Sequence, residues 1–409
     1  MYIYKAAVIG AGTMGAQIAQ TISYAGLPVI LKDIKPDSVE RGLATVRKIY
    51  QGRVEKGKMT AHEMEQKMAL VSGATDYSGF GDVDLAIEAV FEDAGVKRRV
   101  FADLEAACPE SAILATNTSS LSISGLAAGL KRPEKVVGVH FFNPAHVMKL
   151  VEVIPGMATS PETVDDAVAF AESLRKIPIR VQECAGFLVN RLLMPYLNEA
   201  AMALQEISRP EAAVEEAKRL DAAMVALGLP MGPFALTDMI GLDVAAKVAA
   251  ILHDSFGPRM APAALLEEMV KAGRLGPKSG AGFFAYDDRA GDPLPQVVAA
   301  IQKRTGIRGT ACSPSRLLMP MINEAVICLQ EGVATAADID MAMMAGTGFP
   351  QDKGGPLHYA DQVGLDVVLG DLDRFTRELG PRFWPAPMLK RMVAAGFLGV
   401  KSRRGFFTY

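Results

Sequence analysis

The stretch that decides the fold is KAAVIGAGTMG, Lys5–Gly15. It opens with Ala6–Ile9, a short apolar run of the kind found in strands that are buried on both faces. A full G-x-G-x-x-G follows at once, and helical spacing of apolar residues begins after it. A strand, a glycine-rich turn and a helix in this order predict a binding site for the phosphates of a dinucleotide.

Each glycine of the motif has its own physical role. Gly10 permits the tight turn, Gly12 lets the backbone approach a pyrophosphate, and Gly15 permits close packing of the helix on the strand. Thr13 and Met14 belong to the same motif, and helical spacing follows from Gln17. The free N–H groups and partial positive charge of a helix N-terminus favour phosphate oxygens, so we expect the three glycines, Thr13 and Met14 to contact or support the cofactor.

A second apolar run, Val29–Leu31, ends close to Asp33, which lies 18 residues beyond Gly15. A carboxylate at this point can accept hydrogen bonds from ribose hydroxyls. It would also repel a 2′-phosphate, so the sequence predicts NAD as the cofactor.

Composition narrows the remaining classes of protein. The 409 residues suffice for two or three domains, and a 22% charged fraction is ordinary for a globular protein. The net charge of −3 favours neither nucleic acid nor an anionic membrane as a partner. Four cysteines without C-x-x-C spacing predict a reducing compartment and no metal site. With no room for a signal peptide and no run of about 20 apolar residues, we expect a cytoplasmic protein.

Polar residues follow the next predicted strands. Glu88 lies near the end of the apolar run 85–90, and Lys97 falls in the first turn of a helix expected over 93–107. A further apolar run, 112–116, leads into Asn117-Thr118-Ser119-Ser120. Ligands bind at the carboxyl ends of such strands, although a plain turn with helix caps explains the second segment equally well.

One histidine has a partner that the sequence itself identifies. The runs 136–142 and 149–154 are two strands, and a hairpin centred near residue 146 places His140 opposite Glu152. A carboxylate beside an imidazole fixes the ring and favours its protonated form, which suits a general base near neutral pH. We therefore interpret His140 as catalytic.

The second half of the chain is helical and repeated. Arg191-Leu192-Leu193-Met194-Pro195 recurs as Arg316-Leu317-Leu318-Met319-Pro320, and the Gly282-Phe283-Phe284 turn recurs as Gly405-Phe406-Phe407. Matching residues of the two copies are 125 residues apart at the start of the repeat and 123 apart at its end. A helical domain of roughly 100 residues is therefore duplicated. Asn190 in the first copy is replaced by Ser315 in the second. We therefore expect only the first copy to serve the chemistry.

The predicted fold class is α/β: a Rossmann-type doubly wound sheet domain followed by two repeated all-α domains. The boundaries expected from the patterns are 1–183 for the sheet domain, 184–287 for the first helical domain, 288–309 for a linker and 310–409 for the second helical domain.

Taken together, the motifs resemble one family, the short-chain L-3-hydroxyacyl-CoA dehydrogenases. The resemblance is carried by GAGTMG (10–15), EAVFED (88–93), NTSSL (117–121), HFFNP (140–144), KLVEV (149–153), GFLVNRLL (186–193) and PMGPF (230–234). The part after residue 310 is similar to the second helical repeat of the fused β-oxidation multifunctional enzymes. The resemblance implies NAD-dependent oxidation of (S)-3-hydroxyacyl-CoA to 3-oxoacyl-CoA in fatty-acid metabolism.

The resemblance also implies roles for individual residues. His140 would take the proton of the 3-hydroxyl, with Glu152 as its partner, while Ser119 and Asn190 would hold the oxygen at C3. The nicotinamide ribose side of the cofactor would be lined by Glu88, Lys97 and Asn117. The basic turn Arg53, Lys56 and Lys58 is a candidate for the CoA part of the substrate, although any one of these residues alone is more often a solvated side chain.

Two other functions stay open at the level of sequence. One is a dehydrogenase of a small free hydroxy acid or sugar acid, and the other is a non-catalytic NAD-binding subunit that docks a hydratase. The implied partners are the acyl-CoA substrate and a separate enoyl-CoA hydratase. Single-repeat relatives pair through their helical domain, so we expect the two copies here to form an internal pseudo-dimer in a monomeric chain.

Overall fold

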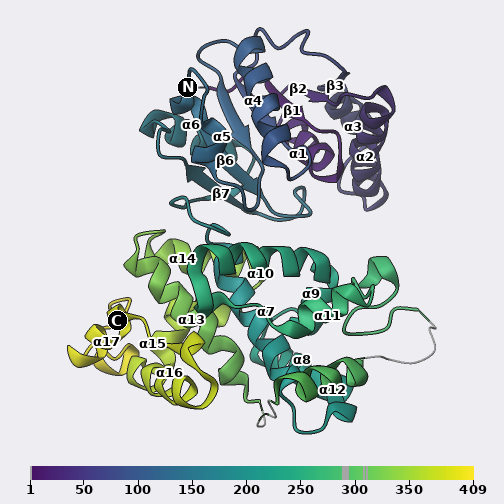
Figure 1. The fold of residues 1–409 in the computed structure, drawn as a ribbon. Coiled ribbons are helices and arrows are strands. Elements are labelled where there is room, and N and C mark those ends of the chain that lie inside the picture. Colours follow the sequence, from purple (N-terminus) through teal and green to yellow (C-terminus); the bar gives the residue numbers. More distant parts are fainter. Residues whose placement is uncertain (1, 288–293, 307–308, 310–311) are drawn as a thin grey trace. The chain divides into compact units, whose positions relative to one another are not determined.

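The computed structural model describes residues 2–287, 294–306, 309 and 312–409. The chain divides into two compact units, Met1–Phe187 and Leu188–Tyr409. Every strand of the described chain belongs to the first unit, and the second unit is helical (Figure 1).

The first unit alternates strands and helices. In chain order its elements are β1 (Ala6–Ile9), α1 (Thr13–Tyr24), β2 (Val29–Lys32), α2 (Pro36–Glu55), α3 (Ala61–Met68), β3 (Val71–Ala74), β4 (Leu85–Glu88), α4 (Ala94–Ala107), β5 (Ile113–Thr116), α5 (Ile123–Ala127), β6 (Val136–Phe141), β7 (Leu150–Pro155), α6 (Pro161–Ser173) and β8 (Ile177–Arg180).

The eight strands form one sheet in the order β3-β2-β1-β4-β5-β6-β7-β8. Neighbours are parallel except for β6 and β7, which form the expected antiparallel pair. The chain runs outward from β1 to β3 and then returns to place β4 on the other side of β1. The strand order therefore reverses at β1 and β4, and ligands bind at the carboxyl ends of the strands at such a point.

Helices cover both faces of this sheet. Alternate residues of β1, such as Val8, join a core with residues of α1, α2 and α6, among them Ile18, Tyr50 and Phe170. The opposite face contacts α4 and α5. Strands buried on both faces explain why these segments appear in the sequence as continuous apolar runs.

The second unit consists of helices. They are α7 (Val189–Gln205), α8 (Ala213–Leu227), α9 (Pro233–Ile240), α10 (Leu242–Phe256), α11 (Ala264–Lys271), α12 (Leu294–Thr305), α13 (Pro314–Gln330), α14 (Ala336–Thr347), α15 (Pro356–Val363), α16 (Leu365–Leu379) and α17 (Pro387–Ala394). Helices α7 to α11 correspond in order to α13 to α17.

A buried aspartate explains the repeated Gly-Phe-Phe turn. Asp238 accepts hydrogen bonds from the backbone N–H groups of Phe283 and Phe284 and from the Tyr286 hydroxyl. Asp361 makes the same three contacts in the second copy, with Phe406, Phe407 and Tyr409. A Cβ on Gly282 would overlap the Asp238 carboxylate, so only glycine lets the turn close on it.

The two repeats contact each other through α7 and α13, and the contact is reciprocal. Arg191 Nε donates to Glu324 Oε1 at 2.7 Å. Its counterpart Arg316 donates through Nε to Glu199 Oε1, also at 2.7 Å. The Nη2 atoms extend the pattern with two further matching bonds, from Arg191 to Glu331 and from Arg316 to Glu206. Each repeat thus offers the same patch to the other, as an approximate two-fold relation requires.

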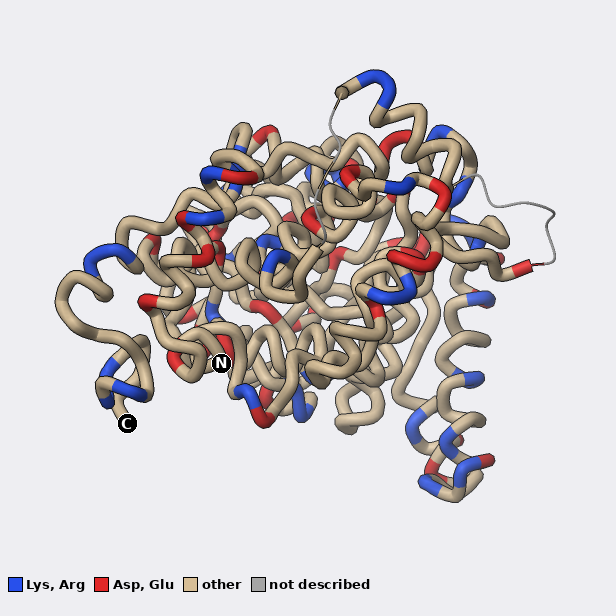
Figure 2. The backbone as a smooth tube through the Cα atoms, turned by 90° about the horizontal axis from the view of Figure 1, so that it is seen from below, with Lys and Arg blue, Asp and Glu red and all other residues tan. Residues whose placement is uncertain are grey.

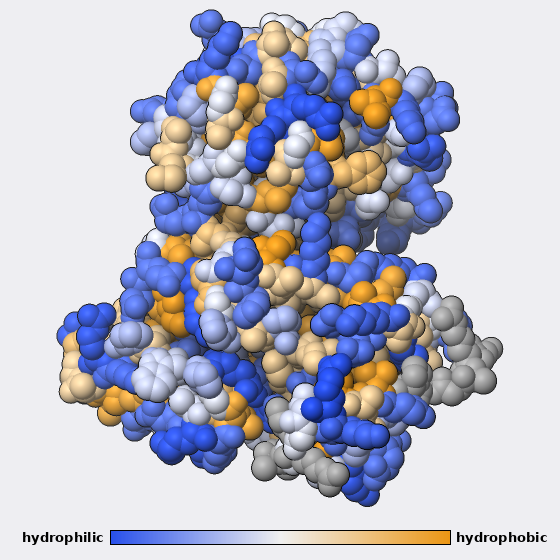
Figure 3. All heavy atoms as spheres, in the orientation of Figure 1, coloured by the Kyte–Doolittle hydropathy of each residue, from blue (hydrophilic) through white to orange (hydrophobic). Residues whose placement is uncertain are grey.

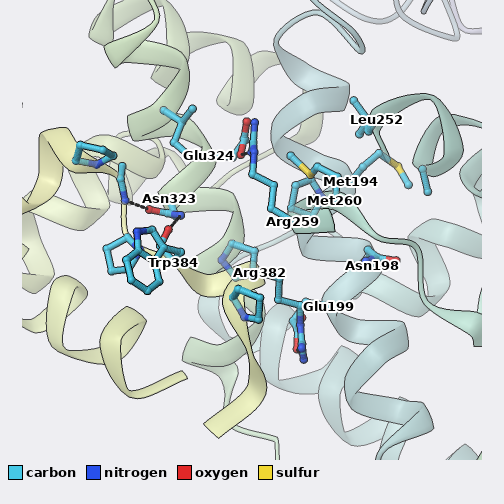
Figure 4. Close-up of a pocket in the computed structure, with 18 residues that line it drawn as sticks. Met194, Asn198, Glu199, Leu252, Arg259, Met260, Asn323, Glu324, Arg382 and Trp384 are labelled. Carbon is cyan, nitrogen blue, oxygen red and sulfur yellow. Dashed lines mark hydrogen bonds and ion pairs between the residues drawn. The ribbon is translucent and has the colours of Figure 1, made fainter. Parts of the chain in front are cut away.

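Two more arginines lengthen this network. Arg259 contacts Glu324, and Arg382 Nε donates to Glu199 Oε2 at 2.7 Å (Figure 4). Apolar residues including Met194 and Met260 lie close by and line, with these charged groups, a pocket of about 170 Å³ between the repeats. The carboxylates that face the pocket are therefore already paired with arginines.

The segment 288–309, assigned to a linker from its composition, contains helix α12. Leu294, Val298 and Ile301 recur at helical spacing and are buried. The amide of Gln302 donates to the backbone oxygens of Gln205 and Ile207 at 3.0 and 2.7 Å. Most of the connection therefore packs on the first repeat, because its apolar face has a place to be buried.

The architecture is the predicted one, a doubly wound α/β sheet followed by helical repeats. Acidic and basic residues are interspersed along the trace (Figure 2), and on the face seen in Figure 3 apolar residues lie in small groups among hydrophilic ones. No helix within the described ranges combines the length and the apolar character needed to cross a bilayer.

Candidate active site

The glycine cradle, residues 10–15, follows β1 at the point where the strand order reverses. Gly10 has a φ of 105°, and a Cβ there would lie 2.5 Å from the Ala89 backbone oxygen. A Cβ on Gly15 would overlap the backbone of Gly10, whereas a Cβ on Gly12 would meet nothing within 4 Å. Gly10 and Gly15 therefore close the turn, and Gly12 borders open space.

The start of α1 is available to an anion. The first turn holds no acidic residue, and no side chain caps the N-terminus at Gly12. Gly10, Gly12, Thr13 and Met14 line a cavity of about 770 Å³. Open space, uncapped N–H groups and a helix N-terminus together fit the pyrophosphate of a dinucleotide.

Asp33 lines the same cavity and is held in place by the backbone. Its carboxylate accepts from the N–H of Ala11 at 2.9 Å and from the N–H of Ile34 at 2.8 Å. Each oxygen keeps further lone pairs, which ribose hydroxyls can use. The cavity therefore has the groups that the ribose of NAD needs.

His140 and Glu152 are brought together by the register of β6 and β7, which pairs them directly. His140 Nδ1 and Glu152 Oε2 are 2.8 Å apart, and both side chains are buried. The imidazole also packs against the rings of Phe142 and Phe187, with centroids 4.5 and 5.8 Å away. With its hydrogen on Nδ1, the ring donates to Glu152 and leaves the lone pair of Nε2 to accept a proton.

Ser119 lies in the loop after β5 and is held by Glu92. The backbone N–H of Ser119 donates to Glu92 Oε1 at 3.0 Å, and the hydroxyl of Thr118 donates to the same atom at 2.5 Å. Burial raises the pKa of Glu92, but Lys97 and these hydrogen bonds outweigh it and hold the pKa below its usual value. Glu92 therefore stays ionised and fixes the loop that carries Ser119.

The role of Glu92 was missed at the level of sequence. It is part of the EAVFED segment, yet nothing in the local pattern links residue 92 to a loop 26 residues further on. The signal that could have found it is positional, since β4 and β5 are neighbouring parallel strands and their following loops must meet.

Glu88 and Lys97 form a buried ion pair at the end of β4. Lys97 Nζ donates to both carboxylate oxygens of Glu88, at 2.8 and 2.9 Å, and the two residues are 0% and 1% exposed. The Thr116 hydroxyl and the Val90 N–H also donate to Glu88, each at 2.6 Å. Their observed contacts tie the end of β4 to α4 and β5.

Asn117 connects the ends of two strands. Its Oδ1 accepts from the backbone N–H of Phe141 at 2.8 Å, directly beside His140. This bond holds the loop that carries Ser119 beside the strand that carries His140, at the carboxyl ends of β5 and β6. Asn190 belongs to the second unit, where it occupies the first turn of α7.

Of the three basic residues proposed for CoA, Arg53 lies in the last turn of α2, Lys56 follows the helix, and Lys58 borders a second cavity. Arg53 donates through Nη2 to the Tyr24 hydroxyl at 2.7 Å and stacks on the Tyr24 ring, while Lys56 is exposed. Lys58 lines a cavity of about 460 Å³ together with Tyr24, Lys67 and Arg175. Lys58, Lys67 and Arg175 outnumber Glu63, the one carboxylate in this lining, so the hollow suits an anionic group.

Family models agree with this geometry. Residues 5–184 match the NAD binding domain of 3-hydroxyacyl-CoA dehydrogenase. Residues 186–286 and 314–409 each match the C-terminal domain of the same family.

Individual relatives point the same way. The chain is 40% identical over 400 residues to the fatty acid oxidation complex subunit alpha of Shewanella amazonensis, covering 96% of this chain but 56% of that protein. It is similar to 3-hydroxybutyryl-CoA dehydrogenase from Escherichia coli K12, with 31% identity, a TM-score of 0.86 and coverage of 97% and 100% of the two chains. It is also similar to (S)-3-hydroxybutyryl-CoA dehydrogenase from Ralstonia eutropha, with 38% identity and a TM-score of 0.67. That match covers 70% of this chain and 100% of the other.

The cradle, the ribose carboxylate and the buried His140–Glu152 pair thus occur in a chain whose two parts both match one family. The chain belongs to the 3-hydroxyacyl-CoA dehydrogenase family.

Proposed function

We propose that this chain oxidises (S)-3-hydroxyacyl-CoA thioesters reversibly, with His140 as the general base. The observation that carries the proposal is the pairing of His140 Nδ1 with the buried Glu152 carboxylate at 2.8 Å. It holds the ring in the orientation and tautomer that a base acting through Nε2 requires.

Each residue has a separate role in the proposed reaction. Nε2 of His140 takes the proton of the 3-hydroxyl, and Glu152 stabilises the imidazolium that results. The Ser119 hydroxyl and the Asn190 amide donate hydrogen bonds to the C3 oxygen, which stabilises its developing negative charge. NAD, when bound, accepts the hydride that leaves C3. Gly12, Thr13 and Met14 hold the pyrophosphate, and Asp33 holds the ribose.

The CoA part of the substrate is assigned to the basic turn of the first unit. Arg53 stacks on the Tyr24 ring, Lys58 lines the polar hollow, and Lys56 adds positive charge close to them in sequence. CoA carries several phosphate groups, and arginine and lysine are the side chains that bind phosphate.

Fatty-acid β-oxidation in the cytoplasm is the proposed setting. The chain spans 56% of the length of the Shewanella relative, whose name describes one subunit of a fatty acid oxidation complex. We propose that an enoyl-CoA hydratase acts beside this chain as a separate partner. The two repeats, with their reciprocal Arg–Glu contacts, are proposed to act as an internal pseudo-dimer.

The test is turnover of acetoacetyl-CoA with NADH, beside free acetoacetate at the same concentration. We expect oxidation of NADH with the thioester and little with the free acid. Preference for the free acid would favour a small hydroxy-acid dehydrogenase. Binding of NADH without turnover of either substrate would favour a non-catalytic subunit.

A further inference from the structure

The glycine cradle and Asp33 do not explain the whole lining of the cofactor cavity. Val96, Val100 and Asp103 follow one another at helical spacing on α4 and line the cavity, together with Tyr77 from the segment after β3. Both valines are only partly buried. Apolar walls with exposed surface are suited to a flat heterocycle, which would cover them.

Tyr77 is held from three sides. Its ring meets the buried Phe80 edge-on at a centroid distance of 5.2 Å, and Lys32 Nζ lies 4.3 Å from the ring centroid. Its hydroxyl donates to Asp103 Oδ2 at 3.3 Å. Burial and the Asp103 charge raise the pKa of Tyr77, so the phenol keeps its hydrogen and remains a donor.

This contact determines what Asp103 can offer to a ligand. An ionised carboxylate has acceptors and no donor, and the one hydrogen that Tyr77 carries points to Oδ2. Asp103 therefore offers the cavity an acceptor. A base that places an amino group there gains a hydrogen bond, and a base that places a carbonyl oxygen there meets repulsion between two acceptors.

We propose that Asp103, positioned by Tyr77, accepts a hydrogen bond from the 6-amino group of the adenine of NAD and makes the cavity selective for adenine over a 6-oxopurine. The proposal rests on NAD lying along the cavity, with its pyrophosphate at the start of α1 and its ribose at Asp33.

The experiment measures binding by calorimetry, so that its readout does not depend on turnover. The two ligands are NAD and nicotinamide hypoxanthine dinucleotide, which has an oxo group in place of the 6-amino group. The wild type should bind NAD about 10-fold more tightly, the size of one hydrogen bond to an ionised group. Asp103→Asn can turn its amide to either base, so the ratio should fall to about 2-fold or less.

Two further variants complete the design. Asp165 lies on α6 and forms an exposed ion pair with Arg180. Asp165→Asn removes this carboxylate and should keep the wild-type ratio of the two dissociation constants. Tyr77→Phe leaves Asp103 in place without its fixing donor, and its ratio should lie between those of the wild type and Asp103→Asn.

A wild type that binds both dinucleotides equally, or an Asp103→Asn variant with the wild-type ratio, would overturn the adenine contact alone. A wild type that binds neither would overturn the assignment of the cavity to NAD as well. The two failures are therefore distinguishable.

Discussion

The imidazole of His140 touches two kinds of neighbour, each of which limits what it can do. The Glu152 carboxylate fixes one nitrogen, and the rings of Phe142 and Phe187 restrict how far the imidazole can turn. Because Glu152 is fully buried, its charge acts on the ring with little screening by water. The two residues therefore act together, and replacing one or the other should lower activity by different amounts.

Replacing His140 by alanine should lower kcat by about 10²–10⁴-fold, the usual contribution of a general base. NAD binding should persist, because the cradle and Asp33 are separate from the imidazole. Steady-state kinetics with acetoacetyl-CoA and a calorimetric titration with NAD measure the two effects. A His140→Ala enzyme with wild-type turnover would remove the histidine from the mechanism.

Glu152→Gln should lose less activity than His140→Ala. The glutamine keeps a hydrogen-bond acceptor for the ring but cannot stabilise by charge the imidazolium that forms in the reaction. Steady-state kinetics with acetoacetyl-CoA compare kcat of the two variants with that of the wild type. A Glu152→Gln enzyme with the wild-type kcat would mean that Glu152 is only a packing residue.

The sequence predicts this pair correctly because the geometry of a hairpin is local. Residues 140 and 152 are equidistant from the turn, and the period of two in a strand decides which side chains face each other. Glu92 was missed because its partners are set by the parallel pairing of β4 and β5, which links residues far apart in sequence. The roles of Ser119 and Asn190 remain proposals drawn from the family resemblance.

At the scale of secondary-structure elements, buried carboxylates fasten one element to the next. Glu88 joins β4 to α4 and β5, Asp238 closes the turn after α11, and Asp221 on α8 accepts from the N–H groups of Phe234 and Ala235 at the start of α9. Such links were not predicted, because the sequence shows the acidic residue but not the free N–H groups that it will meet.

Glu88→Gln should destabilise the first unit strongly. Removing one partner from a buried ion pair typically costs about 3–5 kcal/mol, because the other charge stays buried without compensation. Lys97 keeps a contact with Glu92 at 3.2 Å, which places the expected loss at the lower end of that range. Denaturant unfolding measures it, and Asp82→Asn, at an exposed pair with Lys5, is the control.

Asp221 should make the stability of the second unit depend on pH. Burial raises the pKa of Asp221 to about 6, whereas an aspartate in an unfolded chain has a pKa of about 3.9. The folded state binds the proton more tightly, so this contribution to stability is complete below about pH 4 and is lost as the pH rises through about 6. Asp221→Asn should lack this component. Trp384, the single tryptophan and part of the second unit, provides the fluorescence signal for unfolding at pH 4.5 and pH 7.

At the scale of the whole molecule, the duplicated helical segment decides the assembly. The face of α7 that meets α13 carries Arg191 and Glu199, which form ion pairs with Glu324, Arg316 and Arg382 of the other repeat. The duplication is plain in the sequence, but the network is not, since its charged residues are spread over α7, α13 and two later turns. The helix in segment 288–309 was likewise hidden by the Gly, Pro and Asp residues that precede it.

A chain that ends after Gly306 should dimerise or precipitate, whereas the full chain should be monomeric. The truncation keeps α12 on the first repeat but exposes the apolar and charged face that α13 covers. Sedimentation velocity at several concentrations measures the difference. A truncated chain that stays monomeric and fully active would show that the second repeat is dispensable.

The reciprocal arginine–glutamate contacts have a consequence for how this protein can change over generations. In a dimer of identical subunits every substitution in such an interface occurs twice, once on each side. Here the two sides are encoded separately, so a substitution enters one arm alone and its counterpart is untouched. The second copy has Ser315 where the first has Asn190, while Arg316 next to it makes its bonds to Glu199 and Glu206. Under the proposed function only the first copy contributes a side chain to the chemistry, so substitutions in the second copy are limited mainly by the contact between the repeats.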